Sequence, residues 1–103
     1  MLKFPNKFFW GTATSSHQIE GDNMNNDWWE AEQNGRLPRK SGKACDSYNR
    51  YEEDFDLAKA MANNAHRFSI EWSRIEPEEG KFSEEAIEHY RKVLIGLHAR
   101  GLE

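Results

Sequence analysis

Several features that would point to other classes of protein are scarce in this sequence of 103 residues. A single cysteine, Cys45, cannot form an internal disulfide, so the sequence predicts a reducing, cytoplasmic location. No apolar run approaches the length of a membrane span, so no membrane partner is expected. The net charge is -4, whereas nucleic-acid binding needs clustered positive charge. These features argue against a protein that binds membranes or nucleic acid.

Recognisable ligand sets for metals and cofactors are also missing. His17, His66 and Cys45 do not follow a metal-ligand spacing. There is no phosphate-cradling glycine loop and no nucleophile elbow. We expect His66 to be a hydrogen-bonded residue at the start of a strand. The sequence therefore predicts neither a metal nor a cofactor.

Two stretches are typical of strands. The first begins near Phe8, where apolar residues pass into small ones without strict alternation, as in a buried strand of a parallel sheet. The second covers residues 65–72. Alternation in the second stretch predicts that Phe68, Ile70 and Trp72 point one way and Arg67, Ser69 and Glu71 the other. Trp10 and Trp72, which lie within these apolar stretches, are expected in the core.

Two helices are predicted to alternate with these strands. The first begins after Asp46 or Ser47 as N-cap and ends at the pair of asparagines at 63–64. The second begins after Ser83, with acids in its first turn and bases in its last, and stops at Gly101. The resulting order of strand, helix, strand and helix predicts an α/β fold with a parallel sheet.

A long polar segment, residues 22–44, separates the first strand from the first long helix. Long loops of compact domains are usually functional or disordered. Residues 27–32 within the segment, DWWEAE, are predicted to form a short helix. The two tryptophans there have no evident core position, so one is expected to anchor the loop and the other to face a cleft.

Two motifs resemble those of family 1 glycoside hydrolases, the retaining β-glycosidases. Residues 8–21 read FFWGTATSSHQIEG and residues 67–80 read RFSIEWSRIEPEEG. The resemblance implies a (β/α)8 TIM barrel, of which this chain would supply the first two βα units. Such a barrel needs roughly 250 residues. Residues 1–103 are therefore expected to be an incomplete, N-terminal part of a glycoside hydrolase barrel domain, whose sheet edges the remainder of the barrel would cover.

The resemblance also implies an activity, the hydrolysis of β-glucosides or β-galactosides with retention and without a cofactor. Retention requires two carboxyl groups about 5–5.5 Å apart. The family's Thr-x-Asn-Glu-Pro and Glu-Asn-Gly motifs, which carry them, do not occur here, so we expect the isolated chain to be inactive. Glucosidase, galactosidase and 6-phospho-glycosidase remain open, as does the oligomeric state. The alternative is a non-catalytic sugar-binding or complementing fragment.

Gln18 and Arg67 are the main candidate site residues. A carboxamide can accept a hydrogen bond from one sugar hydroxyl and donate to its neighbour, and the glutamine of this motif binds the sugar in the resembled family. The resemblance likewise implies that Arg67 lies beside the absent nucleophile and keeps that carboxylate ionised. The alternatives are a glutamine that ties down a loop and an arginine in a structural ion pair.

Glu20, Glu71 and Trp72 are possible supporting residues around the site. Glu20 and Glu71 follow neighbouring strands and could form a carboxylate pair. We favour structural roles instead, with Glu20 as a hydrogen-bonding brace for the first loop and Glu71 as a partner of Arg67 or of a neighbouring strand.

Overall fold

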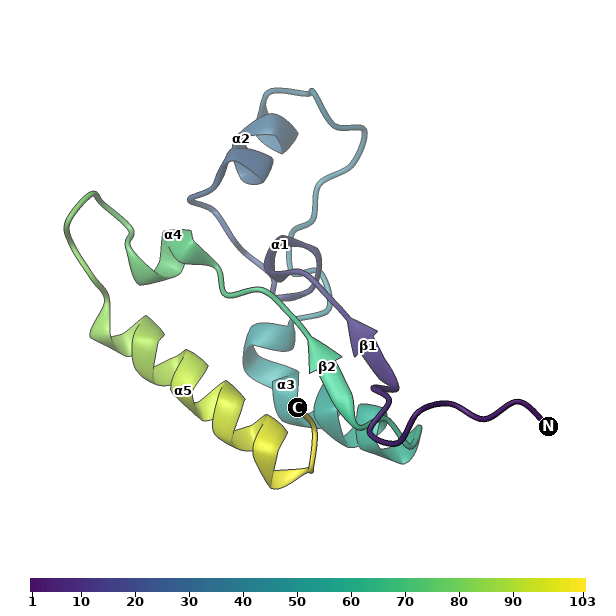
Figure 1. Cartoon of the computed structure of the whole chain (residues 1–103). Helices are drawn as coiled ribbons and strands as arrows, with labels where there is room; N and C mark the ends of the chain where they lie inside the picture. Colours follow the sequence, from purple (N-terminus) through teal and green to yellow (C-terminus); the bar gives the residue numbers. More distant parts are fainter.

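The computed structural model describes residues 1–103 and has an α/β architecture (Figure 1). Two short parallel strands form its sheet, and five helices follow or connect them. The elements are β1 (Gly11–Ala13), α1 (Ser16–Ile19), α2 (Asp27–Gln33), α3 (Ser47–Ala60), β2 (Ala65–Arg67), α4 (Trp72–Ile75) and α5 (Glu84–Ala99). The predicted order of strand, helix, strand and helix is confirmed, with short helices inserted in the segments that follow the strands.

The two strands pair in parallel, with Gly11 opposite Ala65 and Ala13 opposite Arg67. A side chain on Gly11 would bring its Cβ to 2.5 Å from the carbonyl oxygen of Ala65, so the close approach requires glycine here. Glu103 lies along the other edge of β2, because His66 N–H donates to its carbonyl (2.8 Å) and its own N–H donates to Asn64 (3.0 Å). These two bonds have the pattern of a parallel neighbour.

Both strands are shorter than the sequence predicts. The expected start near Phe8 is wrong, because the side chain of Asn64 accepts from Trp10 N–H (2.7 Å) and donates to the Phe8 carbonyl (3.1 Å) in place of a backbone ladder. The expected end of the second strand at residue 72 is also wrong. Beyond Arg67 the hydroxyl of Ser69 accepts from the N–H of Ser16, so the chains diverge into helices instead of pairing.

The two long helices lie close to where the sequence predicts them. Asp46 is the N-cap of α3, and the Ser83 hydroxyl accepts from Ala86 N–H at the start of α5. Gly101 follows α5 with a φ of +70°, as predicted for a C-terminal stop. The predicted asparagine stop of α3 is wrong, since the helix ends at Ala60 and Ala62 takes the left-handed conformation.

The hydrophobic core lies between α3 and α5 and is small. Eight apolar residues are buried in it. They are Phe55, Ala58, Ile75, Ala86, Tyr90, Val93, Leu97 and Leu102. Phe68 packs on this cluster, and the ring of His66 lies 5.6 Å from that of Phe55, so even-numbered residues of the second strand region face the helices. None of the helices combines the length and the apolar composition that a bilayer crossing requires.

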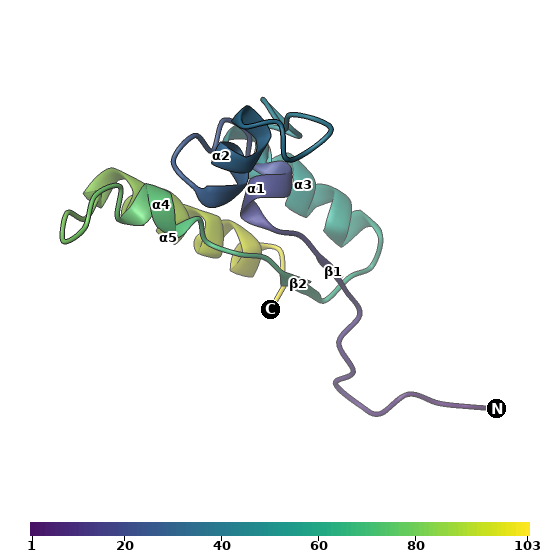
Figure 2. The same cartoon turned by 90° about the horizontal axis from the view of Figure 1, so that it is seen from above.

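The N-terminal segment extends away from the rest of the molecule (Figure 2). Phe4, Phe8 and Trp10 stack on one another with ring centroids 4.5–4.7 Å apart, yet all three remain exposed. The predicted core position of Trp10 is therefore wrong. β1 pairs only with β2, so no further strand lies on this side, and Trp10 remains 48% exposed.

Candidate functional site

The parallel pairing brings α1, which follows β1, and α4, which follows β2, to the same end of the sheet (Figure 1). The carboxyl end of a parallel sheet is where α/β proteins place their binding sites. In this chain polar side chains gather there, and several of them are buried.

Glu20 and Glu71 are joined through Tyr90 of α5. The Tyr90 hydroxyl donates to Glu20 Oε1 (2.7 Å) and accepts from the N–H of Glu71 (3.1 Å). Glu20 and Glu71 are 7% and 8% exposed, and Tyr90 is 4% exposed. The hydroxyl therefore satisfies two groups that would otherwise be buried without a partner. Glu71 does not pair with Arg67, contrary to one of the roles expected for it.

Asn23 and Arg74 complete this cluster. Asn23 Nδ2 donates to both carboxylates, at 3.3 Å to Glu20 and 3.2 Å to Glu71. Arg74 Nε donates to Glu20 Oε2 (3.2 Å) and to Asn23 Oδ1 (2.6 Å), and its Nη2 donates to the Gly21 carbonyl (2.7 Å). We call Glu20, Asn23, Glu71, Arg74 and Tyr90 the polar knot, because they tie the segments after both strands to α5.

The two carboxyl groups of the polar knot have opposite pKa shifts. Burial raises the pKa of Glu20, and the hydrogen bonds from Tyr90 and Asn23 only partly oppose it. Burial also acts on Glu71, but hydrogen bonds from Ser73, Ser16 and Asn26 outweigh it and lower the pKa of that carboxyl. Burial and the bond to Glu20 raise the pKa of Tyr90. Glu20 also lines the cavity between the strands and α3, whereas Glu71 does not.

A second polar cluster fixes the long segment, residues 22–44. His17 Nε2 lies 2.8 Å from Glu32 Oε1, and Ser41 donates to Glu32 Oε2 from both its N–H and its hydroxyl (3.0 Å each). Those bonds lower the pKa of Glu32, that from the Ser41 N–H most and that from His17 next. Asn26, the N-cap of α2, donates to Glu71 Oε2 (3.1 Å). The segment is thus an ordered loop, and its short helix is confirmed.

Gln18 lies in the single turn of α1 rather than directly at a strand end. Its side chain is exposed and forms no hydrogen bond with the rest of the chain. The backbone beneath it is held at both ends, since Ser16 donates to Ser69 and Glu20 belongs to the polar knot. Gln18 therefore presents a free carboxamide on a fixed support.

Arg67, the last residue of β2, is exposed and forms no ion pair. Because His66 and Phe68 face the helices, alternation directs Arg67 to the opposite side of the sheet. It lines an open hollow of about 400 Å³ together with Phe9, Gly11 and Glu103. Gln18 is not among the residues that line this hollow.

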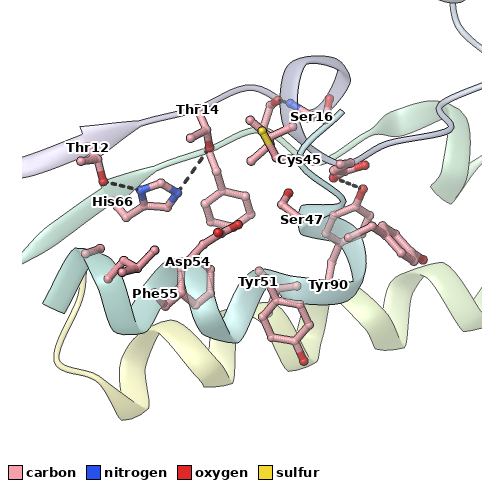
Figure 3. A pocket seen from close by; sticks show the side chains of 18 of the residues that line it. Thr12, Thr14, Ser16, Cys45, Ser47, Tyr51, Asp54, Phe55, His66 and Tyr90 are labelled. Atoms are coloured by element: carbon pink, nitrogen blue, oxygen red, sulfur yellow. Dashed lines mark hydrogen bonds between the residues drawn. The ribbon is translucent and has the colours of Figure 1, made fainter. Parts of the chain in front are cut away.

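A cavity of about 270 Å³ lies between the strands and α3 (Figure 3). Its lining is mostly apolar, and at one end His66 bonds to Thr12 (2.8 Å) and Thr14 (3.3 Å), as Figure 3 shows. The expectation that His66 is a hydrogen-bonded residue at the start of a strand is confirmed. Neither Gln18 nor Arg67 reaches this cavity, so it is a gap behind the sheet rather than their site.

Several residues of the site escape sequence reasoning. Asn23, Arg74 and Tyr90 lie in a loop and in two different helices, so no local spacing links them. Trp72 is 61% exposed at the start of α4, so its predicted core position is wrong. The strand ends before it, and its Nε1 donates to Glu76 Oε2 (2.8 Å) at the surface. Of the loop tryptophans, Trp28 is exposed and Trp29 is half-buried.

Comparison with known proteins agrees with this arrangement. The chain is 41% identical, over 98% of its length, to a β-glucosidase of an Agrobacterium species. It is 38% identical, over 91% of its length, to a 1,4-β-D-glucan glucohydrolase of Thermotoga neapolitana. A solved β-glycosidase from Pyrococcus horikoshii superposes with a TM-score of 0.90 and 55% identity over 98% of this chain.

The chain spans about a quarter of the length of each of these proteins, 24% in all three cases. The family model for glycosyl hydrolase family 1 matches residues 1–103. The similarity therefore extends over the strands, the polar knot and the ordered loop together, and not over one motif alone. The chain belongs to glycosyl hydrolase family 1.

Proposed function

We propose that residues 1–103 form the first two βα units of a (β/α)8 barrel that hydrolyses β-linked glucosides or galactosides with retention. Family membership and the β-glucosidase and glucohydrolase names of the relatives support this function. The strands support the barrel, because β1, β2 and Glu103 lie in chain order as parallel neighbours. Closing such a sheet would also pair the free edge of β1.

The catalytic carboxylates are expected to come from outside these residues. Retaining hydrolysis needs a nucleophile and an acid that both face the sugar. Glu20 and Glu71 are buried and already accept hydrogen bonds from Tyr90, Asn23 and other donors. They hold the loops in place, and the isolated chain should not hydrolyse a glycoside.

The observation that carries the proposal is the free carboxamide of Gln18 at the carboxyl end of the sheet. An exposed amide without an intramolecular partner can bond two neighbouring sugar hydroxyls at once. Arg67, which is exposed and unpaired, would stand beside the nucleophile and lower the pKa of that carboxylate. The expected ligand is the non-reducing sugar of the substrate, and no metal or cofactor is required.

A chimera with the Pyrococcus horikoshii enzyme would test the function. Residues 1–103 would replace the matching quarter of that protein, and hydrolysis of an aryl β-glucoside would be measured. We expect the chimera to be active and residues 1–103 alone to be inactive. Gln18→Ala should lower kcat/KM about 10- to 100-fold, since two hydrogen bonds of about 0.5–1.5 kcal/mol each are lost.

Gln33→Ala is the matched control, because Gln33 lies at the end of α2 and bonds only to Lys40. A folded but inactive chimera, or equal rates for Gln18→Ala and Gln33→Ala, would contradict the proposal. Titration of residues 1–103 with cellobiose, followed by tryptophan fluorescence, tests the alternative of a non-catalytic sugar-binding fragment. Saturable quenching that Gln18→Ala abolishes would support a sugar-binding fragment.

We also propose a reducing, cytoplasmic location. Cys45, the single cysteine, is exposed and forms no disulfide. An exposed thiol of this kind is kept reduced in the cytoplasm and is prone to pairing elsewhere. Intermolecular disulfide formation in the protein isolated without reductant from its native source would contradict this location.

A further inference from the structure

His17, the residue before Gln18, lies between two elements of the ordered loop. Its side chain is 13% exposed. Nε2 lies 2.8 Å from Glu32 Oε1, at the end of α2, and Nδ1 lies 3.1 Å from Asn26 Nδ2, at the start of α2. The imidazole therefore joins α1 to both ends of the next helix.

The hydrogen bonds around Asn26 fix which ring nitrogen carries the proton. Asn26 Oδ1 accepts from Trp29 N–H (2.8 Å) as the N-cap of α2, so its Nδ2 faces the other way. That Nδ2 donates to Glu71 Oε2 and to His17 Nδ1 (3.1 Å each). Nδ1 must then be an acceptor without a hydrogen, and the proton lies on Nε2, where it points at Glu32.

A helix as short as α1 cannot hold its own geometry. A single isolated turn is unstable in water, because the conformational entropy lost in fixing it exceeds the stabilisation from its one or two hydrogen bonds. The backbone bonds of α1 are few, from Gln18 to Ser15 (3.1 Å) and from Glu20 to Ser16 (2.9 Å). Its start is tied to Ser69 and its end to the polar knot. The side chain of His17 is the tie on the loop side.

We propose that His17, as the neutral Nε2–H tautomer, is a positioning residue that fixes the direction of the Gln18 carboxamide by tying α1 to α2. Gln18 has no side-chain bond of its own, so the orientation of its amide follows from the backbone that carries it. The benefit for sugar binding rests on the proposed function, but the tie and its tautomer do not depend on it.

Nitrogen NMR of the 103-residue chain would test the tautomer. The ring of His17 should show a bare Nδ1 and a protonated Nε2 at neutral pH. Asn26→Asp keeps the N-cap acceptor but replaces the Nδ2 donor with an oxygen, so it should place a proton on Nδ1. Asn34→Asp adds the same charge at the far end of α2, where the side chain contacts only Glu30, and should leave the ring unchanged. A hydrogen on Nδ1 in the unmodified chain would overturn the proposal.

Amide exchange of Gln18 and Glu20, with relaxation of the Gln18 side-chain amide, would test the positioning role. His17→Leu should speed exchange at both amides about tenfold, as expected for loss of a hydrogen bond to a charged group. His17→Gln should largely restore slow exchange, because its amide nitrogen can still reach Glu32. Unchanged exchange in His17→Leu would overturn the proposal. If His17→Leu prevents folding, the test passes to His17→Gln. Amide exchange of Gln18 and Glu20 in that variant as fast as in an unfolded chain would then overturn the proposal.

Titration with methyl β-glucoside adds a readout of function. Faster motion at Gln18 in His17→Leu should be accompanied by a severalfold weaker affinity, and His17→Gln should restore it. Absence of binding by every variant would count against sugar binding by these residues alone. The tautomer and exchange results would still decide the role of His17.

Discussion

The two ends of the sheet differ in how they treat polar and apolar side chains. At the carboxyl end, the charged groups of Glu20 and Glu71 are buried and hydrogen-bonded. At the amino end, the aromatic rings of Phe4, Phe8 and Trp10 are 59%, 39% and 48% exposed. Folded proteins usually show the reverse, with acids outside and large apolar residues inside. The buried acids at the carboxyl end find their partners within these residues, whereas the aromatic rings at the amino end stay exposed to solvent.

This difference matters because the hydrophobic core is thin. Only 15 of the 103 residues are buried, and eight of these are apolar core residues. In a small core, the free energy gained by burying apolar surface only slightly exceeds the cost of the conformational entropy lost on folding. The hydrogen bonds of the polar knot therefore contribute much of what holds the loops at the carboxyl end in place. Substitutions in the polar knot should have the largest effects on the free energy of unfolding.

Loss of Arg74 should cause the largest change. Arg74→Ala removes the donors to Glu20, Asn23 and Gly21 and the guanidinium that lies 4.0 Å from the Tyr48 ring centre. Breaking a buried pair costs about 3–5 kcal/mol, and partial exposure of Arg74 reduces this to about 2–3 kcal/mol. Urea unfolding followed by circular dichroism would measure it.

Arg91→Ala is the control for that prediction. Arg91 pairs with Glu88 on the exposed face of α5, and surface pairs of this kind contribute about 0–1 kcal/mol. Equal effects of the two substitutions would show that the buried charges of the polar knot have no special role.

Removal of the Tyr90 hydroxyl should have the next largest effect. Tyr90→Phe leaves the ring in the core but deprives Glu20 of a donor and the Glu71 N–H of an acceptor. An unsatisfied buried polar group costs about 1–3 kcal/mol, so we expect a loss of about 2 kcal/mol in unfolding free energy. Tyr51→Phe is the control, since Tyr51 is half-buried against the same core and its hydroxyl forms no bond. A comparable loss in Tyr51→Phe would contradict the prediction.

Glu71→Gln should have a smaller effect that depends on pH. The Glu71 carboxylate accepts hydrogen bonds from four side chains, those of Ser16, Asn23, Asn26 and Ser73. The NH2 group of a glutamine amide cannot accept, so it would face at least one of these donors without forming a bond. We expect a loss of about 1–2 kcal/mol at pH 7. Because the folded-state pKa of Glu71 lies below its ordinary value of 4.5, its stabilisation is present above that pH and is lost as the pH falls further.

The difference in unfolding free energy between Glu71→Gln and the unmodified chain should therefore become smaller below pH 4.5. Glu20 acts in the opposite sense, because its raised pKa lets the folded state take up a proton first. Comparing each variant with the unmodified chain at every pH removes this contribution. Glu79→Gln, at an exposed position, is the control, and its difference in unfolding free energy from the unmodified chain should not change with pH. A difference that stays constant with pH for Glu71→Gln would contradict the prediction.

The sequence predicts the elements better than it predicts their contacts. Local signals suffice for α5, where Ser83 begins the helix and Gly101 follows its end. They fail for the strand ends, because the length of β1 depends on the side chain of Asn64, 53 residues beyond Gly11. The polar knot is out of reach for the same reason, since Tyr90 and Glu20 are separated by 70 residues. Gln18 is indicated by a local motif, whereas the proposed role of His17 rests on hydrogen bonds to Asn26 and Glu32 that no local spacing indicates.

The smallest effect on stability is expected at the amino end. Phe4→Ser opens the stack with Phe8 and Trp10, but these rings are already exposed, so the unfolding free energy should change by no more than about 0.5 kcal/mol. Its effect should instead appear in self-association, because contiguous exposed apolar surface drives aggregation. Light scattering at equal concentration should fall in Phe4→Ser. Phe82→Ser, equally exposed but outside the stack, should leave scattering unchanged, so an equal fall in both variants would mean that the amino end is not a distinct adhesive surface.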